Sequence, residues 1–242
     1  MRILVVNVNT TASMTAAIAI SARRYARADT EILATQPVWG PESVDSFMEG
    51  YLSAAAVVER VTTFEEPFDA VVLAGFGEPG REGLREVVAV PVLDVTDSAA
   101  AFACQLGYRY SVVTTLARSI PSIQENLRNA GLLDRCASVR ATDLSTLELE
   151  QDERTTRERL AAEARLAIEE DHAEVICLGC AGMAGLDKEL EQVLGVPVVD
   201  GVVAAVKLAE GLYDYGVKTS KIGAFAAPGR KQIHGWPRRA AT

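Results

Sequence analysis

The residue best suited to chemistry in this sequence is Cys180, which follows a short apolar run in the segment LGCAGM, residues 178–183. A thiol at the start of a helix meets the positive end of the helix dipole, which favours the thiolate. The small neighbours let a substrate approach the backbone, and the N–H groups of Ala181 and Gly182 could hold a carboxylate or an oxyanion. This pattern predicts an acid/base cysteine. The alternative interpretation is a small buried thiol at the end of a strand.

Metal and redox chemistry have little support around this thiol. Cys177 and Cys180 form a C-x-x-C pair, but Cys177 lies inside the apolar run EVICLG and is expected in a core. A zinc site needs two further ligands, and the imidazoles of the chain are limited to His172 and His234. Neither histidine is placed for a Cys–His dyad. We therefore predict no metal and no cofactor.

An internal repeat gives Cys180 a counterpart. The segment FDAVVLAGFGEPG (68–80) matches AEVICLGCAGMAG (173–185), so that Gly75 falls on Cys180. Downstream, the segment VPV at 90–92 matches VPV at 196–198, and Asp94 matches Asp200. The chain start RILVVNVN also resembles RYSVVTTL (109–116). The sequence therefore predicts two similar halves in tandem, of which only the second carries the thiol.

Short β-branched runs alternate with longer segments of helical period, which predicts α/β halves with parallel sheets. Strands are expected at 3–6, 31–33, 70–73, 92–94, 111–114, 137–140, 175–178 and 198–200. Helices are expected at 14–27, 44–62, 82–88, 98–106, 120–130, 151–170, 186–193 and 202–213. Two such halves place a cleft at the carboxyl ends of their strands. The loops at 7–13, 75–80, 114–119 and 179–183 are then expected to line it.

Several other side chains in these loops are candidates for substrate binding. Asn9 and Thr114 follow mirrored strands and could donate hydrogen bonds to substrate oxygens, although capping of the next helix is equally compatible with them. Gly75, Phe76 and Gly77 belong to the first-half loop that mirrors the Cys180 loop. We include all five with Ala181 and Gly182 as predicted substrate contacts.

Other polar and aromatic residues are given mainly structural roles. The mirrored Asp94 and Asp200 are expected to cap the helices that follow them. Thr10, Thr11 and Ser13 are candidate caps of the first helix. Trp39, in a Trp-Gly-Pro turn, could wall the pocket or simply pack.

Taken together, MRILVVNVNT at the start, the loop AGFGEPG (74–80), LGCAGM and the downstream VPVVD (196–200) resemble the hydantoin racemases of the aspartate/glutamate/hydantoin racemase superfamily. The resemblance spans residue 1 to about residue 220, and allantoin racemases share the same motifs. It implies two pseudo-symmetric flavodoxin-like α/β domains with the active site between them and no cofactor. It also implies two cysteines that remove and return the C5 proton of a hydantoin ring. By this resemblance Cys180 is the second of these cysteines, and Gly75 stands in place of the first.

The glycine leaves three interpretations open. Cys180 could remove the proton while a water beside Gly75 protonates the other face. Glu78, in the same loop, could serve that face, although a carboxylate at a helix start is an equally good interpretation. The reaction could instead need one acid only, as in arylmalonate decarboxylase, which the chain resembles in its glycine and single catalytic cysteine. A binding protein that has lost its chemistry, or a substituted variant, is also compatible with Gly75.

The resemblance and the composition together complete the expectations. Residues 1–98 and 204–242 are expected to form the first domain and residues 99–203 the second. The net charge of −9 repels nucleic acid and anionic membranes, and the sequence has neither a membrane-length apolar segment nor a nucleotide-binding glycine motif. We expect a cytoplasmic enzyme that acts on a small molecule and forms a homo-oligomer, with reduced cysteines.

Overall fold

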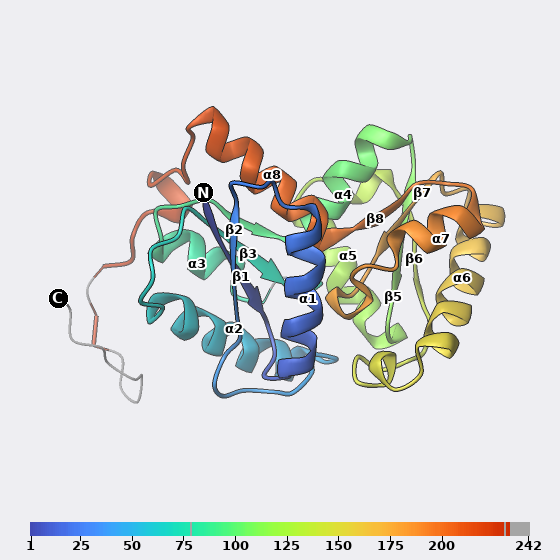
Figure 1. The fold of residues 1–242 in the computed structure, drawn as a ribbon, viewed down its shortest axis with the longest axis horizontal. Helices are drawn as coiled ribbons and strands as arrows, with labels where there is room; N and C mark the ends of the chain where they lie inside the picture. The colour runs from blue at the N-terminus through green and yellow to red at the C-terminus, as the bar shows by residue number, and fades with distance from the viewer. Residues whose placement is uncertain (78, 230, 233–242) are drawn as a thin grey trace.

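A computed structural model of the chain describes residues 1–77, 79–229 and 231–232. Glu78 and His234, both named above, lie outside the described residues. Figure 1 shows two α/β halves side by side, joined through helices that pass between them. The expectation of two similar parallel α/β halves is therefore confirmed.

Each half contains a four-stranded sheet in which every pairing is parallel. The strand order is β2-β1-β3-β4 in the first sheet and β6-β5-β7-β8 in the second. In each sheet the chain adds strands first toward one edge and then toward the other, and this change of direction falls between β1 and β3 and between β5 and β7. Ligands of such folds bind outside the carboxyl ends of the strands at this point. The strands are β1 (Arg2–Asn7), β2 (Glu31–Thr35), β3 (Ala70–Ala74), β4 (Val92–Asp94), β5 (Tyr110–Thr114), β6 (Cys136–Ala141), β7 (Val175–Leu178) and β8 (Val198–Asp200).

The eight expected helices are all present, and capping side chains mark the starts of α2, α4, α6 and α8. α2 begins at Phe47 rather than at residue 44, because the Ser46 hydroxyl accepts the Glu49 N–H and caps the helix. α4 begins at Val95 because the Asp94 carboxylate accepts the Asp97 N–H directly after β4. The helices are α1 (Ala12–Tyr25), α2 (Phe47–Thr62), α3 (Arg81–Val87), α4 (Val95–Leu106), α5 (Ile120–Asn129), α6 (Glu153–Glu169), α7 (Asp187–Leu194) and α8 (Gly201–Tyr215).

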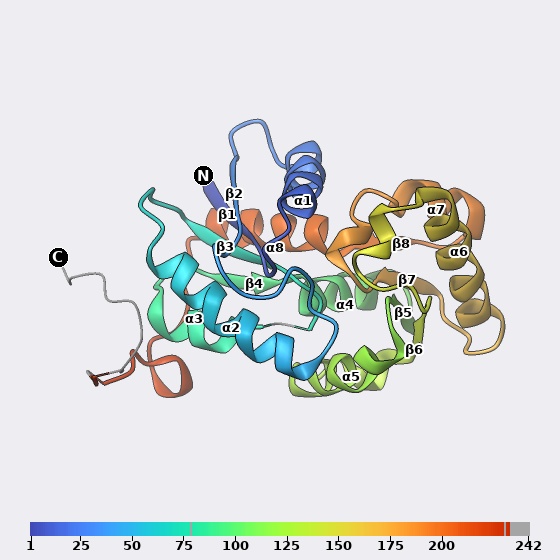
Figure 2. The same ribbon diagram turned by 90° about the horizontal axis from the view of Figure 1, so that it is seen from below.

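Both faces of each sheet are covered, which explains why the strands read as continuous apolar runs. In β1, Ile3 and Val5 pack with residues of α1 and α8, whereas Leu4 and Val6 pack with residues of α2 and α3. The second sheet is covered in the same way, by α4 and α5 on one face and by α6 and α7 on the other. Figure 2 shows α2 and α5, one from each half, on the same side of the molecule.

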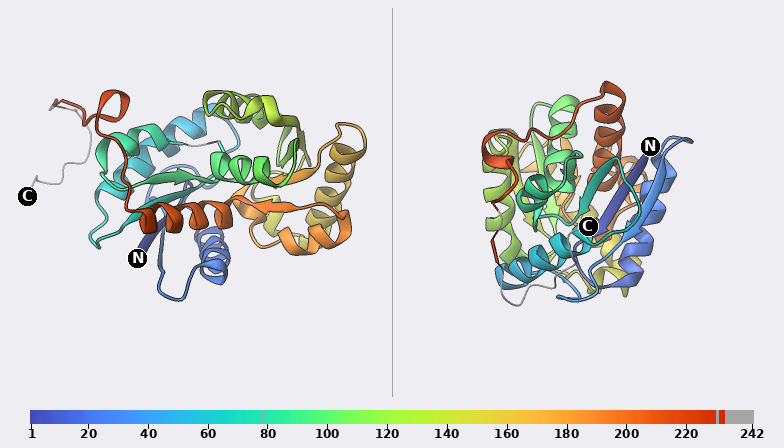
Figure 3. Two further views of the ribbon diagram at one scale, coloured as in Figure 1. Left: turned by 90° about the horizontal axis from the view of Figure 1, so that it is seen from above. Right: turned by 90° about the vertical axis from the view of Figure 1, so that its left-hand side faces the viewer.

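The last helix returns to the first half after the second sheet is complete. Val202, Val206 and Ala209 of α8 pack in the same cluster as Ile3 and Val5 of β1. α8 also packs along α4 at the junction of the halves (Figure 3). Farther along the chain, the Thr219 hydroxyl donates to the Val90 carbonyl, which continues this return toward the first half. Among the helices of the described residues, none has the length and apolar composition needed to cross a membrane.

Candidate active site

A small cavity lies between the two halves, at the ends of the strands where the strand order of each sheet changes direction. Its walls come from the carboxyl ends of β1 and β3 in the first half and of β5 and β7 in the second. The cavity measures about 40 Å³, which is enough for a few water molecules but far below the roughly 300–1,000 Å³ of a typical ligand pocket. The lining residues include Asn7, Val8, Asn9, Gly75, Phe76, Thr114, Thr115, Ser119, Thr146, Gly179, Cys180, Ala181 and Gly182.

Cys180 lines this cavity directly after β7. It precedes a single 3₁₀ turn, η4 (Ala181–Met183), and α7 begins only at Asp187. The expectation that a helix dipole lowers the pKa of this thiol is therefore wrong. Burial raises the pKa of Cys180 to about 11, while hydrogen bonds from the Gly182 N–H and from Thr146 oppose this rise. Near neutral pH the resting side chain is a thiol.

The loop around Cys180 also uses one of the two amides proposed as substrate donors. The Gly182 N–H points at the Cys180 sulfur, with an N···Sγ distance of 3.4 Å. The Gly182 amide is therefore directed at the sulfur rather than at a substrate oxygen. Ala181 is buried and lines the cavity beside it.

On the opposite wall, Gly75 is packed tightly against Val8. A Cβ added at Gly75 would lie 2.3 and 2.6 Å from the two methyl carbons of Val8 and 2.9 Å from its Cβ. These distances are shorter than atoms tolerate, so a side chain at position 75 would require Val8 to move. In the direction of a side chain at position 75, the wall is therefore apolar and filled by Val8.

Asn9 and Thr114 both line the cavity, but their polar atoms are engaged within the protein. The side-chain oxygen of Asn9, Oδ1, accepts hydrogen bonds from the Asn7 side-chain amide and from the Thr11 N–H, each at 2.9 Å. The Thr114 hydroxyl donates to the Gly179 carbonyl at 3.1 Å, which ties the end of β5 to the residue before Cys180. Both side chains hold loops in place in this form.

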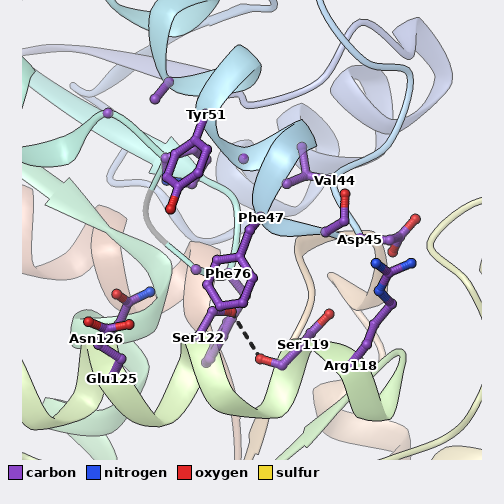
Figure 4. A pocket seen from close by; sticks show the side chains of 16 residues that line it. Val44, Asp45, Phe47, Tyr51, Phe76, Arg118, Ser119, Ser122, Glu125 and Asn126 are labelled. Atoms are coloured by element: carbon purple, nitrogen blue, oxygen red, sulfur yellow. Dashed lines mark hydrogen bonds between the residues drawn. The ribbon is translucent and has the colours of Figure 1, made fainter.

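The two remaining predicted contacts of the first-half loop lie at a second cavity. Phe76 lines both cavities, whereas Gly77 is found on the second one and its N–H donates to the Thr96 hydroxyl at 3.1 Å. This wider cavity measures about 360 Å³ and lies between α2 and α5. In Figure 4, the rings of Phe47, Phe76 and Tyr51 project into it.

The other structural expectations are tested by the hydrogen bonds. Asp94 and Asp200 cap α4 and α8 as expected, because their carboxylates accept N–H groups of Asp97 and Val202 at 2.8 Å. Thr11 is the N-cap residue of α1, but its hydroxyl donates to the Glu42 carbonyl instead of being a cap acceptor. Trp39 lines neither cavity, and its indole N–H donates to the Glu59 carboxylate.

The residues of the two cavities that the sequence did not single out include Val8, Asp45 and Thr146. In the sequence Val8 continues the apolar run of the first strand. Its contact with Gly75 joins two residues that are far apart in the chain. Asp45 and Thr146 come from irregular segments of different halves, and they are hydrogen-bonded to each other at 2.8 Å. No group of three or more histidine, cysteine, aspartate or glutamate side chains in the described residues is arranged to hold a metal ion.

Comparison with known proteins gives consistent matches over the length of the chain. A family model described as Asp/Glu/Hydantoin racemase matches residues 3–209. The hydantoin racemase of Pseudomonas sp. (strain NS671) is 42% identical over 236 residues, which cover 97% of this chain and 95% of that protein. The allantoin racemase structure from Pseudomonas fluorescens is 56% identical with a TM-score of 0.96, covering 97% of this chain and all of that one. The allantoin racemase structure from Klebsiella pneumoniae is 37% identical with a TM-score of 0.94, covering 97% of this chain and 96% of that one.

Proposed function

The chain belongs to the Asp/Glu/hydantoin racemase family, and on this premise we propose that it racemises 5-substituted hydantoins at C5 with Cys180 as the acid/base. Hydantoin racemases and allantoin racemases are both among its relatives. Allantoin is itself a hydantoin ring with a ureido group on C5, so the two names describe the same carbon acid. The 56% identity to an allantoin racemase makes allantoin the first substrate to test.

The observation that carries the proposal is the composition of the small cavity. Among the described residues that line it, Cys180 is the one with an ionisable side chain. It lies at the point of reversal of the second sheet, where parallel α/β folds bind ligands. The cavity around it is otherwise formed by amides, hydroxyls and apolar groups.

Removal of a proton beside a carbonyl produces an enolate, and a positioned side chain that takes this proton acts as a general base. The C5–H bond of a hydantoin is fairly acidic because the negative charge spreads into the ring carbonyl. In the proposed reaction, the Cys180 thiolate takes this proton and the thiol later returns it. On the opposite face, beside Val8 and Gly75, a water would supply the proton, and the resulting hydroxide would take the proton from the Cys180 thiol, which regenerates the thiolate.

The deciding experiment is proton NMR of one enantiomer of allantoin in D₂O, run beside a chiral assay. Loss of the C5 proton signal together with loss of optical activity would support the proposal. Parallel samples without protein and with Cys180→Ala correct for the spontaneous exchange of the acidic C5–H. Absence of enzyme-dependent exchange with allantoin and with 5-alkylhydantoins would reject it.

A second candidate, favoured by the single thiol in the cavity, is a decarboxylase that protonates one face only. The same superfamily resemblance that suggests this reaction predicts CO₂ release from arylmalonates. Measurable CO₂ release, with no exchange at the C5 of hydantoins, would replace the racemase proposal. Exchange with complete retention of optical activity would instead restrict Cys180 to one face of the hydantoin ring.

A further inference from the structure

The wide cavity of about 360 Å³ adjoins the small cavity beside Cys180. Val44, Phe76 and Ser119 line both of them, so the two spaces share a boundary. The small cavity, at about 40 Å³, is too small for a substituted hydantoin. A substrate whose C5 reaches Cys180 therefore has to extend into neighbouring space, and the shared boundary leads into the wide cavity.

Two helices from different halves form the main walls of the wide cavity. Phe47, Gly50 and Tyr51 of α2 line it, and their spacing of three and four residues places them on one face of that helix. Ser122 and Asn126 of α5 line it from the other side and are also four residues apart. Like the small cavity, this space therefore lies between the halves.

The walls of the wide cavity differ in the contacts that they offer. In Figure 4 the rings of Phe47, Tyr51 and Phe76 project into the space between the two helices. The side chains of Glu125 and Asn126 lie together at one end of it. An aromatic group among the three rings gains stacked or edge-to-face contacts in addition to the burial of its apolar surface. A polar group on the same ligand can then reach the end formed by Glu125 and Asn126.

The polar end of the wide cavity suits a neutral hydrogen-bond donor. Within the part of the chain that the structure describes, the side chains of Glu125 and Asn126 form no hydrogen bond or ion pair, whereas the Ser122 hydroxyl donates to the Ser119 carbonyl at 3.0 Å. A carboxylate and an amide oxygen both accept hydrogen bonds, and the carboxylate repels an anionic group. This end lies about 10 Å along α5 from Ser119 at the shared boundary, at ~1.5 Å per residue.

We propose that the wide cavity is the subsite for the C5 substituent, and that it selects a long, neutral substituent with an aromatic body and a hydroxyl at its far end. The probe that represents this class is 5-(4-hydroxybenzyl)hydantoin. The inference rests on the proposed exchange of the C5 proton by Cys180. In this subsite Phe47, Tyr51 and Phe76 surround the aromatic ring, and Asn126 accepts the hydrogen bond of the hydroxyl. The shorter ureido group of allantoin occupies only the part next to Phe76.

The first test fills the subsite through Gly50. Outside its own helix, a Cβ added at Gly50 would meet Val44 Cγ1 at 4.0 Å, which is an ordinary contact, and no other described atom within that distance. Gly50→Phe therefore adds a ring to the face of α2 that lines the cavity. The ratio of kcat/KM for 5-(4-hydroxybenzyl)hydantoin to that for 5-methylhydantoin should fall at least about 10-fold. Gly211→Phe, at an exposed position of α8 where an added Cβ has equal freedom, is the matched control.

The second test removes the hydrogen-bonding group at the far end. Asn126→Leu keeps a branched side chain but has no polar atom to accept the hydroxyl. The ratio of kcat/KM for 5-(4-hydroxybenzyl)hydantoin to that for 5-benzylhydantoin should fall about 3- to 10-fold, as expected for the loss of one hydrogen bond. Asn129→Leu makes the same change at an exposed position of the same helix and should leave this ratio at the wild-type value. Exchange of the C5 proton in D₂O gives each rate, and circular dichroism checks folding.

A binding measurement separates failure of the subsite from failure of the proposed function, because it needs no turnover. Saturation-transfer NMR titrations with 5-(4-hydroxybenzyl)hydantoin should give a dissociation constant that rises at least about 10-fold in Gly50→Phe and stays at the wild-type value in Gly211→Phe. That result supports the subsite even in a protein that exchanges no hydantoin, where the proposed function alone is rejected.

Two results overturn the inference even when the wild type exchanges C5–H normally. The first is a wild-type protein that does not bind the probe, or a folded Gly50→Phe protein that binds and exchanges it as the wild type does. The second is an unchanged ratio of the two benzyl substrates in folded Asn126→Leu, which would show that the far end does not recognise the hydroxyl.

Discussion

The loops that follow β3 and β7 occupy the same place in the two halves but differ in what they offer to the cavity. The second-half loop presents the Cys180 thiol, whereas the first-half loop has Gly75 with the Val8 side chain packed against it. The backbones nevertheless agree at the ends of the two loops, because Gly80 and Gly185 both have left-handed φ values, 91° and 87°. The repeat has preserved the turn in both halves, whereas the reactive group is found in one half only.

The neighbouring strand ends extend this comparison. Val8 follows β1, and the matching position after β5 is Thr115, which lies on the cavity beside Thr114. At these two matched positions the first half contributes an apolar side chain and the second a hydroxyl. Such a division suits a site in which proton transfer is concentrated on one side.

The largest expected effect comes from removing the group that distinguishes the second half. Cys180→Ala makes this loop as unreactive as its counterpart at Gly75, and we expect exchange of the hydantoin C5 proton to fall about 10²–10⁴-fold, the usual contribution of an acid/base side chain. Initial rates of exchange in D₂O, with urea unfolding as a check on folding, measure this. Full turnover in a folded Cys180→Ala protein would show that another residue is the base.

The mirrored aspartates are the next point at which the halves can be separated. Asp94 caps α4 and also forms an ion pair with the buried Arg81 guanidinium at 2.9 Å. Asp200 instead accepts hydrogen bonds from the Ser21 hydroxyl and from backbone amides, including that of Gly185. Asp94→Asn leaves a buried cation with fewer partners, and we expect it to cost about 3 kcal/mol of unfolding free energy. Asp200→Asn should cost about 1 kcal/mol because an amide oxygen can still cap the helix. Urea unfolding at neutral pH compares the two.

The pH dependence gives an independent test of Asp200. Burial raises its pKa in the folded protein, so folded chains bind more protons than unfolded ones between the unfolded pKa, near 3.9, and the higher folded pKa. This contribution to stability is present below that interval and is lost as the pH rises through it. The free energy of unfolding of Asp200→Asn, relative to wild type, should therefore increase across the same interval. A constant difference would contradict the raised pKa.

The contact between Val8 and Gly75 predicts a smaller effect with a defined rescue. Gly75→Cys places atoms against the Val8 methyls and should cost about 1–3 kcal/mol of unfolding free energy, as overpacking does. Combining it with Val8→Ala should restore part of that loss, so that the two changes are not additive. Urea unfolding of the wild type, both single variants and the double variant measures this coupling. Strict additivity would mean that Val8 does not limit the size of residue 75.

These comparisons also show what the sequence could and could not reveal. The strands and helices could be predicted because buried parallel strands are apolar throughout, and the internal repeat is enough to align Gly75 with Cys180. Asp45 and Thr146 could not, because they lie in irregular loops without periodicity and meet only when the halves pack together. The shift of the thiol pKa was predicted with the wrong sign, since the motif gave no sign that a single 3₁₀ turn would follow Cys180.

The smallest expected effect concerns Cys177, whose counterpart in the first half is Val72. Both side chains are fully buried within their sheets, and burial raises the pKa of Cys177 well above its ordinary value. Cys177→Val copies the first half into the second and adds little volume, so we expect less than about 1.5 kcal/mol change in unfolding free energy and unchanged C5 exchange. Urea unfolding and D₂O exchange measure the two quantities. Loss of exchange in a folded Cys177→Val protein would mean that the C-x-x-C pair works as a unit, and the assignment of the chemistry to Cys180 alone would have to be abandoned.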